Sequence, residues 1–540
     1  MTRMRTSSRF KLGIALAMSL SYLPAQALTL PPAPTENPTT PQKAVLGKML
    51  FFEEQLSSNG RMACARCHLP RHGGGDARRT RHPGPDGVLL TSDDTYGSPG
   101  VRRRAPNGTF VEDPLFGLAE QVTPRAAPST HMAGYFDELF WDGRAEGPFV
   151  DPETGATVIA TGGALEALTL HPLLDATEMS REQRGWNELK QRLAIVTPLA
   201  LATDLTPDIE QALLTAPDYP QLFAAAFGDS NISAARMAMA MAAYIRTLAP
   251  DQTPWDLHMQ GVPNVMTASQ LAGWQLFQNQ ARCALCHTPG LFTDRQFRGD
   301  GLTPATDDPG RGGITNAPSD MGKFKVPSLR NVGLKGTLMH NGRFTSITQV
   351  ANFYRLGAGF AGPRDPLLQA LPITQLQVVQ LVDFLENGLV DPRARHALPP
   401  FDRPTLRSES QPIGSNEFGT ATAILGYTPQ LTAHIPTYLG NSEWAIGVQQ
   451  APPQAASLFL LALLPATPGA TLAGVTLNVD APGALVLPTA TDSDGKATIP
   501  VAVPMVPALA GITLYGQFLV NSGIVPHAWC GTTGVSLPLF

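Results

Sequence analysis

The chain has 540 residues, of which only 15% are charged, while glycine and proline each contribute 50. At roughly 150 residues per domain, this length predicts about three or four domains with hydrophobic cores of their own. The formal net charge of −5 lacks the basic surplus of a nucleic-acid-binding protein, so nucleic acid is excluded as a partner.

Residues 1–27 have the pattern of a secretory signal peptide. A basic start is followed by an apolar run over 12–23 and by Ala25-Gln26-Ala27, a cleavage site of small residues. An uncleaved membrane anchor is the alternative, but this run and a second one at 455–464 are shorter than the ~20 residues that span a bilayer. We therefore expect a periplasmic or secreted protein without a transmembrane segment.

Two short motifs share one spacing of cysteine and histidine. Residues 64–68 and 283–287 both follow the pattern C-x-x-C-H, which is typical of haem c attachment. Two thiols bind the haem vinyl groups, and the adjacent histidine becomes an axial ligand of the iron. A zinc site or a pair of redox dithiols is the alternative, but neither explains a histidine after both pairs. The sequence thus predicts two covalent haem c groups held by Cys64, Cys67, Cys283 and Cys286, with His68 and His287 as iron ligands.

Helical patterns surround these motifs. Similar segments at 47–52 and 273–277 precede them, and each indicates a helix leading into a haem loop, as in an internal duplication. Further helices are expected at 233–248, after a serine cap, and at 348–353 and 373–385 from their periodicity.

The segment 71–122 interrupts this pattern. It is rich in glycine, proline and arginine and includes Gly73-Gly74-Gly75 and Arg102-Arg103-Arg104. A loop of this length in a compact domain is usually functional or disordered. We favour a surface insertion without a direct role in the chemistry.

Composition changes near residue 400. From Gln411 to Phe540 only six residues are charged, and β-rich runs at 471–479, 497–503 and 512–520 alternate with turn signals. This pattern predicts an all-β, sandwich-like domain. It contains no visible chemistry, and its Cys530 is expected to be a free thiol.

The expected organisation is therefore a signal peptide followed by three domains. Residues 28–400 are predicted to be mainly α-helical, as two cytochrome c-like haem domains over 28–255 and 256–400. The β-rich domain of unknown role follows over 401–540.

A series of motifs occurs in fixed order along residues 42–390: Leu50-Phe51-Phe52, Leu56-Ser57, the two C-x-x-C-H motifs, Phe140-Trp141-Asp142-Gly143-Arg144, Pro172, Glu178-Met179, Pro327-Ser328-Leu329-Arg330-Asn331 and His340-Asn341-Gly342-Arg343. In this order they resemble the dihaem cytochrome c peroxidase and MauG family. The resemblance implies two haem domains that face each other, with the active site at the N-terminal haem.

The resemblance also implies roles around that haem. Glu178 corresponds to the acid/base that moves a proton between the two oxygens of peroxide, and Pro172 shapes the same pocket. The family's distal glutamine falls on Leu168, which removes one polar contact. Trp141 corresponds to the electron bridge between the haems; a core tryptophan beside a haem is the alternative.

The second haem distinguishes the branches of the family. Tyr354 corresponds to its second axial ligand, which is a methionine in classical peroxidases and a tyrosine in MauG; a tyrosine packed on a helix face is the alternative. Methionine raises a haem's potential, whereas a phenolate stabilises oxidised iron. A haem ligated by His287 and Tyr354 is therefore suited to sharing oxidising equivalents with the first haem.

Other positions depart from the family. Gly117 stands where classical members have a distal histidine, so the first haem is expected to be open at rest, with His72 or His82 as substitutes. Arg330 could pair with a haem propionate. Ala126 replaces an asparagine ligand of calcium and leaves only backbone carbonyls and water, so Ca²⁺ is a doubtful cofactor.

These observations predict an exported dihaem c-type oxidoreductase that reduces hydrogen peroxide at the N-terminal haem and is MauG-like. Its partner would be an electron-donor protein or a protein substrate, which the sequence does not identify. Two alternatives stay open: a classical cytochrome c peroxidase fed by a small redox protein, and a dihaem electron carrier without peroxide chemistry.

Overall fold

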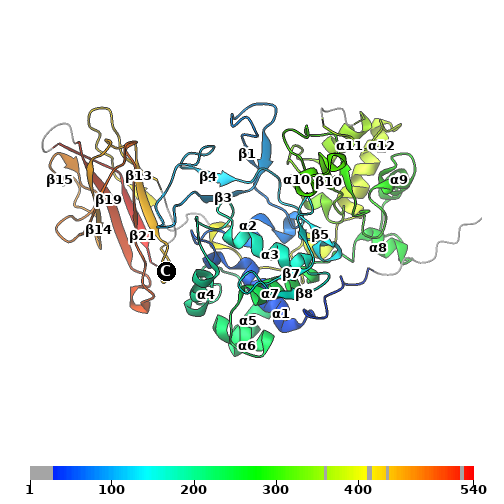
Figure 1. The fold of residues 1–540 in the computed structure, drawn as a ribbon, viewed down its shortest axis with the longest axis horizontal. Helices are drawn as coiled ribbons and strands as arrows, with labels where there is room; N and C mark the ends of the chain where they lie inside the picture. Colours follow the sequence, from blue (N-terminus) through cyan, green and yellow to red (C-terminus); the bar gives the residue numbers. More distant parts are fainter. Residues whose placement is uncertain (1–27, 358–361, 410–415, 433–436, 523–527, 540) are drawn as a thin grey trace, which may run out of the picture.

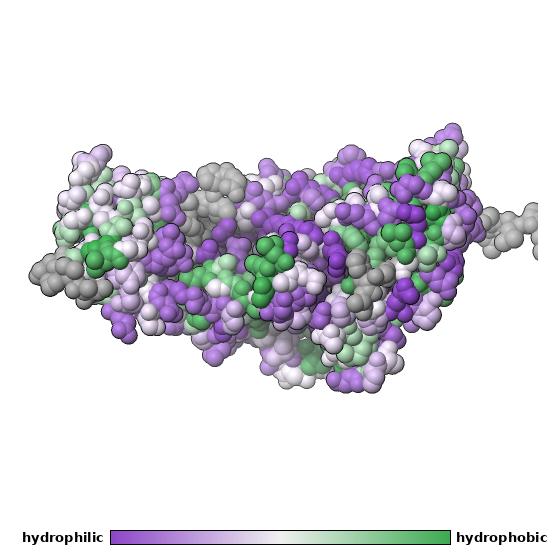
Figure 2. Space-filling model, turned by 90° about the horizontal axis from the view of Figure 1, so that it is seen from above, coloured by the Kyte–Doolittle hydropathy of each residue, from purple (hydrophilic) through white to green (hydrophobic). Residues whose placement is uncertain are grey.

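The computed structural model describes residues 28–357, 362–409, 416–432, 437–522 and 528–539. Three parts follow one another along the long axis: the C-terminal strands, a first helical unit in the middle, and a second helical unit at the other end (Figure 1). The view from above shows the same elongated outline (Figure 2). The expected signal peptide lies outside the described residues.

The chain is a mixture of helix and sheet, with 29% helix and 19% strand. The prediction of mainly α-helical residues 28–400 followed by a β region is confirmed in part, because short strands also occur between the helices of residues 28–400. Between the helices, short antiparallel ribbons of two to four residues per strand take part of residues 80–159 and 297–325. Periodicity could not reveal these ribbons because their strands are too short to show an alternation.

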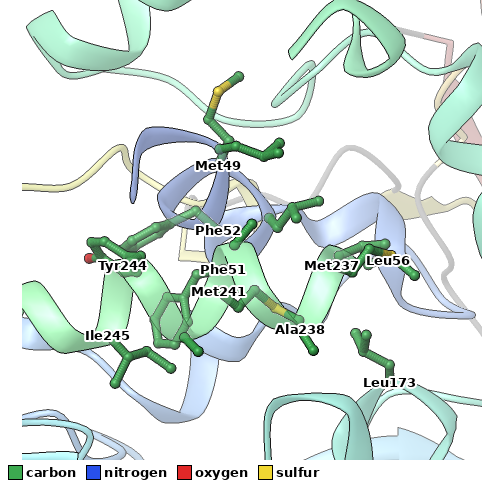
Figure 3. Close-up of a cluster of buried hydrophobic side chains, with 14 of the residues drawn as sticks. Met49, Phe51, Phe52, Leu56, Leu173, Met237, Ala238, Met241, Tyr244 and Ile245 are labelled. Atoms are coloured by element: carbon green, nitrogen blue, oxygen red, sulfur yellow. The ribbon is translucent and has the colours of Figure 1, made fainter. Parts of the chain in front are cut away.

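The first unit contains seven helices among the described residues: α1 (Pro41–Phe52), α2 (Cys64–Cys67), α3 (Ala164–Leu174), α4 (Trp186–Ile195), α5 (Pro207–Thr215), α6 (Tyr219–Phe227) and α7 (Ala234–Thr247). The expected helix at 233–248 is confirmed as α7, and its cap Ser233 accepts a hydrogen bond from the Arg236 backbone N–H at 3.2 Å. Apolar side chains of α1 and α7 interlock in the core (Figure 3).

The second unit contains α8 (Pro254–Met259), α9 (Ala268–Gln278), α10 (Gly312–Thr315), α11 (Ile347–Arg355) and α12 (Gln375–Asp383), and the short helix α13 (Pro392–Arg395) follows them. The helices expected around 273–277, 348–353 and 373–385 are confirmed as α9, α11 and α12. After α12 the chain returns to the first unit, because Ala394, Phe401 and Leu406 pack into the core of that unit.

One helix crossing occurs in both units. A Cβ atom added to Gly47 of α1 would lie 1.9 Å from the carbonyl oxygen of Ala240 in α7, and one added to Gly273 of α9 would lie 2.1 Å from that of Gln380 in α12. Only glycine allows the two backbones to approach so closely. The helix that leads into each C-x-x-C-H motif is thus held against its partner in the same way.

In the C-terminal region, as far as the structure describes it, all named strands pair in antiparallel fashion. The main sheet has the strand order β11 (Asn416–Phe418), β21 (Gly534–Pro538), β19 (Thr513–Asn521), β14 (Ala456–Ala462) and β17 (Leu485–Ala490), with β20 (Trp529–Gly531) beside β19. A second sheet consists of β12 (Gln430–Leu431), β13 (Ala445–Gln449) and β18 (Ala497–Pro500). Two further short strands, β15 (Thr471–Leu472) and β16 (Val475–Thr476), form a hairpin.

Both sheets contribute to one core. Ile446 of β13, Ile499 of β18 and Phe518 of β19 belong to the same buried cluster, which gives the region the sandwich-like character expected from its sequence. Cys530 is a free, buried thiol in this cluster.

The segment 71–122 is more than a surface insertion, which corrects the sequence interpretation. It forms two ribbons, β1 (Thr80–His82) with β2 (Thr95–Gly97) and β3 (Pro99–Arg102) with β4 (Glu120–Val122). Its Arg104 is 2% exposed, and its Phe110 packs on the core of the C-terminal sheets. The segment therefore joins the first unit to the β region.

A buried group of charges fixes this junction. The carboxylate of Glu443, just before β13, lies 3.1 Å from Arg184 Nε and 3.3 Å from Arg192 Nη2. Arg104 donates to the Glu443 carbonyl oxygen at 2.7 Å. The same three arginines donate to the carbonyl oxygens of Leu56, Ser57 and Ser58, which precede the first C-x-x-C-H motif. We call Glu443 and Arg104, Arg184 and Arg192 the arginine cluster.

Candidate functional site

One cavity of about 710 Å³ is lined by the expected catalytic, cofactor-binding and iron-ligating residues. This volume falls within the range of small-molecule and cofactor pockets, about 300–1,000 Å³. Its walls come from both helical units and include Cys64, Cys67, His68, Trp141, Pro172, Glu178, Cys283, Cys286, His287, Arg330 and Tyr354. Among the described residues that line it, His72, His82 and Gly117 do not occur.

The two motif histidines have the same tautomer. His68 Nδ1 lies 3.1 Å from the Gly74 carbonyl oxygen, and His287 Nδ1 lies 3.1 Å from those of Phe292 and Pro327. A carbonyl oxygen only accepts, so Nδ1 carries the proton in both rings and the lone pair of Nε2 is free to bind a metal. Burial lowers the pKa of both histidines, which keeps them neutral.

The four motif cysteines are free thiols at the edge of the same cavity. Burial raises the pKa of Cys64, Cys67 and Cys283 to about 12, the opposite of what a reactive redox dithiol requires. The described part of the chain contains no group of three or more His, Cys, Asp or Glu side chains arranged to hold a metal ion. The cysteines and the free Nε2 atoms fit two haem groups better than they fit a zinc site or a dithiol centre.

The carboxyl group of Glu178 has a pKa close to neutral pH. Burial, together with the charge of Asp175, raises its pKa to about 7, against an opposing effect of Arg144. It is partly exposed and lines the cavity. Such a group can both accept and donate a proton at physiological pH.

The segment 71–122 positions this acid, a function that the sequence did not reveal. The backbone N–H of Val101 in β3 donates to the Thr177 carbonyl oxygen at 2.9 Å, and Gln121 Nε2 donates to the Ala176 carbonyl oxygen at 2.8 Å. A Cβ added to Gly100 would lie 1.9 Å from the Thr177 oxygen. The ribbon β3–β4 thus bonds to and packs closely against the residues before Glu178.

Helix α3 forms the wall beside Glu178. Leu168 and Pro172 both lie on this helix and line the cavity. Pro172 occurs in the last turn, where it ends the hydrogen-bond ladder, and the Asp175 backbone N–H caps the helix on the Pro172 carbonyl oxygen. The chain then turns toward Glu178.

Trp141 lies at the contact between the two units. Its indole Nε1 donates to the Ala126 carbonyl oxygen at 2.8 Å, and its own carbonyl oxygen accepts from the Lys325 backbone N–H at 2.8 Å. Lys325 belongs to β10 (Lys323–Lys325), which pairs with β9 (Phe297–Gly299) in the second unit. The Ala126 carbonyl is therefore already used by the indole, although it was one of the few oxygen atoms expected for calcium.

His340 joins the tryptophan to the second unit. Its ring centroid lies 6.4 Å from that of Trp141 and 3.6 Å from that of Phe324, on which it stacks. Its Nδ1 lies 2.9 Å from a carboxylate oxygen of Asp300. Aromatic rings thus continue from the first unit into the second.

Tyr354 lies on α11 and lines the wall that the second motif also forms. Burial, with the nearby Asp300, raises the pKa of its phenol. Met339 lines this wall as well, so a thioether and a phenol are both present there. The sequence comparison singled out only the phenol.

Arg330 lines the cavity, but most of its donors are occupied. Its guanidinium forms a two-point ion pair with Asp256 at 2.7 and 2.8 Å and donates to the carbonyl oxygens of Gly290 and Pro250. Its expected contact with a haem propionate stays a prediction.

The similarity of this chain to known proteins supports the interpretation of the cavity as a haem site. Residues 41–264 match the family described as di-haem cytochrome c peroxidase. The resemblance to that family is confirmed. The cytochrome-c peroxidase IdrP1 of Pseudomonas sp. (strain SCT) is 26% identical over 73% of this chain and 91% of its own length. The methylamine utilization protein MauG of Methylophilus methylotrophus is 29% identical over 66% of this chain and 85% of its own length.

These relatives confirm the prediction of an oxidoreductase of the di-haem peroxidase class, with haem as cofactor. A solved structure described as a MauG-like protein associated with microbial copper homeostasis covers 70% of this chain and 96% of its own, with a TM-score of 0.50 and 24% identity. That likeness concerns the fold alone. Within the described residues no helix has the length and apolar character needed to cross a membrane.

Proposed function

We propose that the protein is an exported di-haem c-type peroxidase that reduces hydrogen peroxide at a haem held by Cys64, Cys67 and His68. The single observation that carries this proposal is the shared cavity, which both C-x-x-C-H motifs and the near-neutral acid Glu178 line. Export to the periplasm or outside the cell rests on the signal-peptide pattern of residues 1–27.

The proposed organisation is two haem domains, over 28–255 and 256–400, followed by the β domain over 401–540. The repeated close approach at Gly47 and Gly273 supports it, as does the repeated bond from His68 and His287 to a backbone carbonyl. The second haem would be held by Cys283, Cys286 and His287.

When bound, the haem iron would supply an open coordination position at which peroxide is reduced and electrons are accepted. The Glu178 carboxylate takes a proton from one peroxide oxygen and returns it to the other, which leaves as water. Leu168 and Pro172 form an apolar wall on this side, so bulk water is kept from competing for the proton. His68 Nδ1 donates to the Gly74 carbonyl oxygen, so its Nε2 would be free to bind the iron.

Trp141 would carry electrons between the two haem sites. The hydrogen bond from its indole to Ala126 fixes the ring, and the bond from Lys325 ties its backbone to the second unit. His340, stacked on Phe324, continues the aromatic path.

The MauG-like function would require Tyr354 to bind the iron of the second haem. Such a haem would share oxidising equivalents with the first, and a protein substrate or an electron donor would supply the electrons. Met339 on the same wall supports the alternative of a classical cytochrome c peroxidase. An electron carrier without peroxide chemistry is the third candidate.

The test uses full-length protein matured in a host that attaches haem c. Mass spectrometry should give two covalent haems, and peroxide should change the absorption spectrum within the mixing time. Glu178→Gln should slow this reaction by about 10²–10⁴-fold, whereas Glu182→Gln, a nearby acid paired with Arg103 and outside the cavity, should not. A haem-loaded protein that is inert to peroxide would leave only the electron carrier, and a haem-free protein would refute the proposal.

A further inference from the structure

Several cationic side chains line the cavity. Arg125, Arg144, Arg298 and Arg330 each form an ion pair with an aspartate. The aspartate carboxylates balance the charges of these four guanidinium groups.

Lys335 differs from these arginines. It follows the 3₁₀ turn Val332–Leu334 of the second unit, and its Nζ reaches the Ala127 carbonyl oxygen of the first unit at 3.4 Å. Burial alone lowers its pKa to about 8, with no contribution from any carboxylate of the described residues. An ammonium enclosed in this way costs free energy unless an anion accompanies it.

The environment of Lys335 places its charge beside the first haem motif. Its side chain runs along Gly73-Gly74-Gly75, the segment that follows His68 and supplies the carbonyl partner of His68 Nδ1. A Cβ added to Gly75 would lie 3.3 Å from Lys335 Nζ, and one added to Gly73 would lie 2.9 Å from Lys335 Cγ. Gly73 and Gly75 thus make room for a lysine from the other unit, while a Cβ on Gly74 would meet Thr130 and His131.

Lys335 is partly exposed and lines the cavity, and its side chain also contacts Ala127, Gly73 and Gly75. A ligand that fits this position is a carboxylate, which balances the charge and accepts a charge-assisted hydrogen bond.

We propose that Lys335 binds a propionate carboxylate of the haem attached to Cys64 and Cys67, so that the second unit sets the potential of the first haem. The inference rests on the proposed function, because it requires a haem at this motif. It assigns a positioning role to a residue outside the C-x-x-C-H motifs.

The test is a redox titration of the di-haem protein. Removal of a positive charge stabilises ferric iron, so Lys335→Met should lower the ferrous-to-ferric ratio of the first haem about tenfold at a given solution potential, which is about 59 mV for one electron. Lys335→Arg should restore the ratio to within about threefold, because it keeps the charge and the donors. The matched control is Lys323→Met, which removes a charge that pairs with Asp320 outside the cavity.

A second readout reports the contact itself. The propionate bending band of the first haem in the resonance Raman spectrum should shift in Lys335→Met and stay in place in Lys323→Met. If the wild type carries two haems and reacts with peroxide, but Lys335→Met changes neither potential nor band, the inference is refuted and the proposed function stands. If the wild type carries no haem, both are refuted.

Discussion

Glu443 offers the sharpest test of how the β region supports the first helical unit. Its carboxylate is 8% exposed and lies within 3.3 Å of Arg184 and Arg192, which are 0% and 4% exposed. Glu443→Gln removes the one negative charge and leaves these guanidinium groups buried without a counterion. Loss of one partner from a buried ion pair costs about 3–5 kcal/mol.

The expected effect is large enough for calorimetry. At about 2–4 °C per kcal/mol, the unfolding midpoint should fall by roughly 6–20 °C. The matched control is Glu112→Gln, because Glu112 pairs with Lys496 across the same junction but is 53% exposed. An exposed pair contributes about 0–1 kcal/mol. If both variants unfold within about 2 °C of the wild type, the arginine cluster does not hold the junction together and the reasoning is wrong.

The remaining predictions concern the helix crossing and the cavity. Gly47→Ala should cost about 1–3 kcal/mol because its Cβ meets a carbonyl of α7, whereas Gly336→Ala, at an exposed position with no atom within 4 Å of its Cβ, should leave the melting curve unchanged; equal melting curves would contradict the close approach. The rate of the peroxide reaction should rise as pH increases through about 7, because the pKa of Glu178 is raised to about 7 and only its ionised form accepts a proton; a pH profile that persists in Glu178→Gln would assign the titration to another group. Tyr354→Phe should change the spectrum and potential of the second haem while Met339→Leu should not, and the opposite pattern would transfer the axial position to Met339.

Part of this site could be predicted from short sequence motifs. The C-x-x-C-H motifs need only five consecutive residues, so Cys64 and Cys283 stand out without any knowledge of the fold. Helix α7 was equally accessible, because its serine cap and small apolar residues act within one turn. The positions of Trp141, Glu178 and Tyr354 came from the family resemblance, and the structure brings all three to one cavity.

The interactions that the sequence did not reveal connect distant residues. Arg104 and Glu443 are 339 positions apart, and no periodicity relates them. The ribbon β3–β4 has strands of four and three residues, too short for an alternating pattern, yet it fixes the segment before Glu178. The proposed role of Lys335 depends on its contacts with glycines of the other unit, and these contacts form only when the two units pack together.

The arginine cluster has a consequence for the order of events during biosynthesis. Translation produces Leu56–Ser58 and the first C-x-x-C-H motif long before Glu443, and domains form from the N-terminus onward. Until the last quarter of the polypeptide has been synthesised, the arginines that bind the carbonyl groups of Leu56–Ser58 lack the Glu443 carboxylate as their partner. The segment that leads into the first C-x-x-C-H motif therefore completes its packing only after the C-terminal strands have formed.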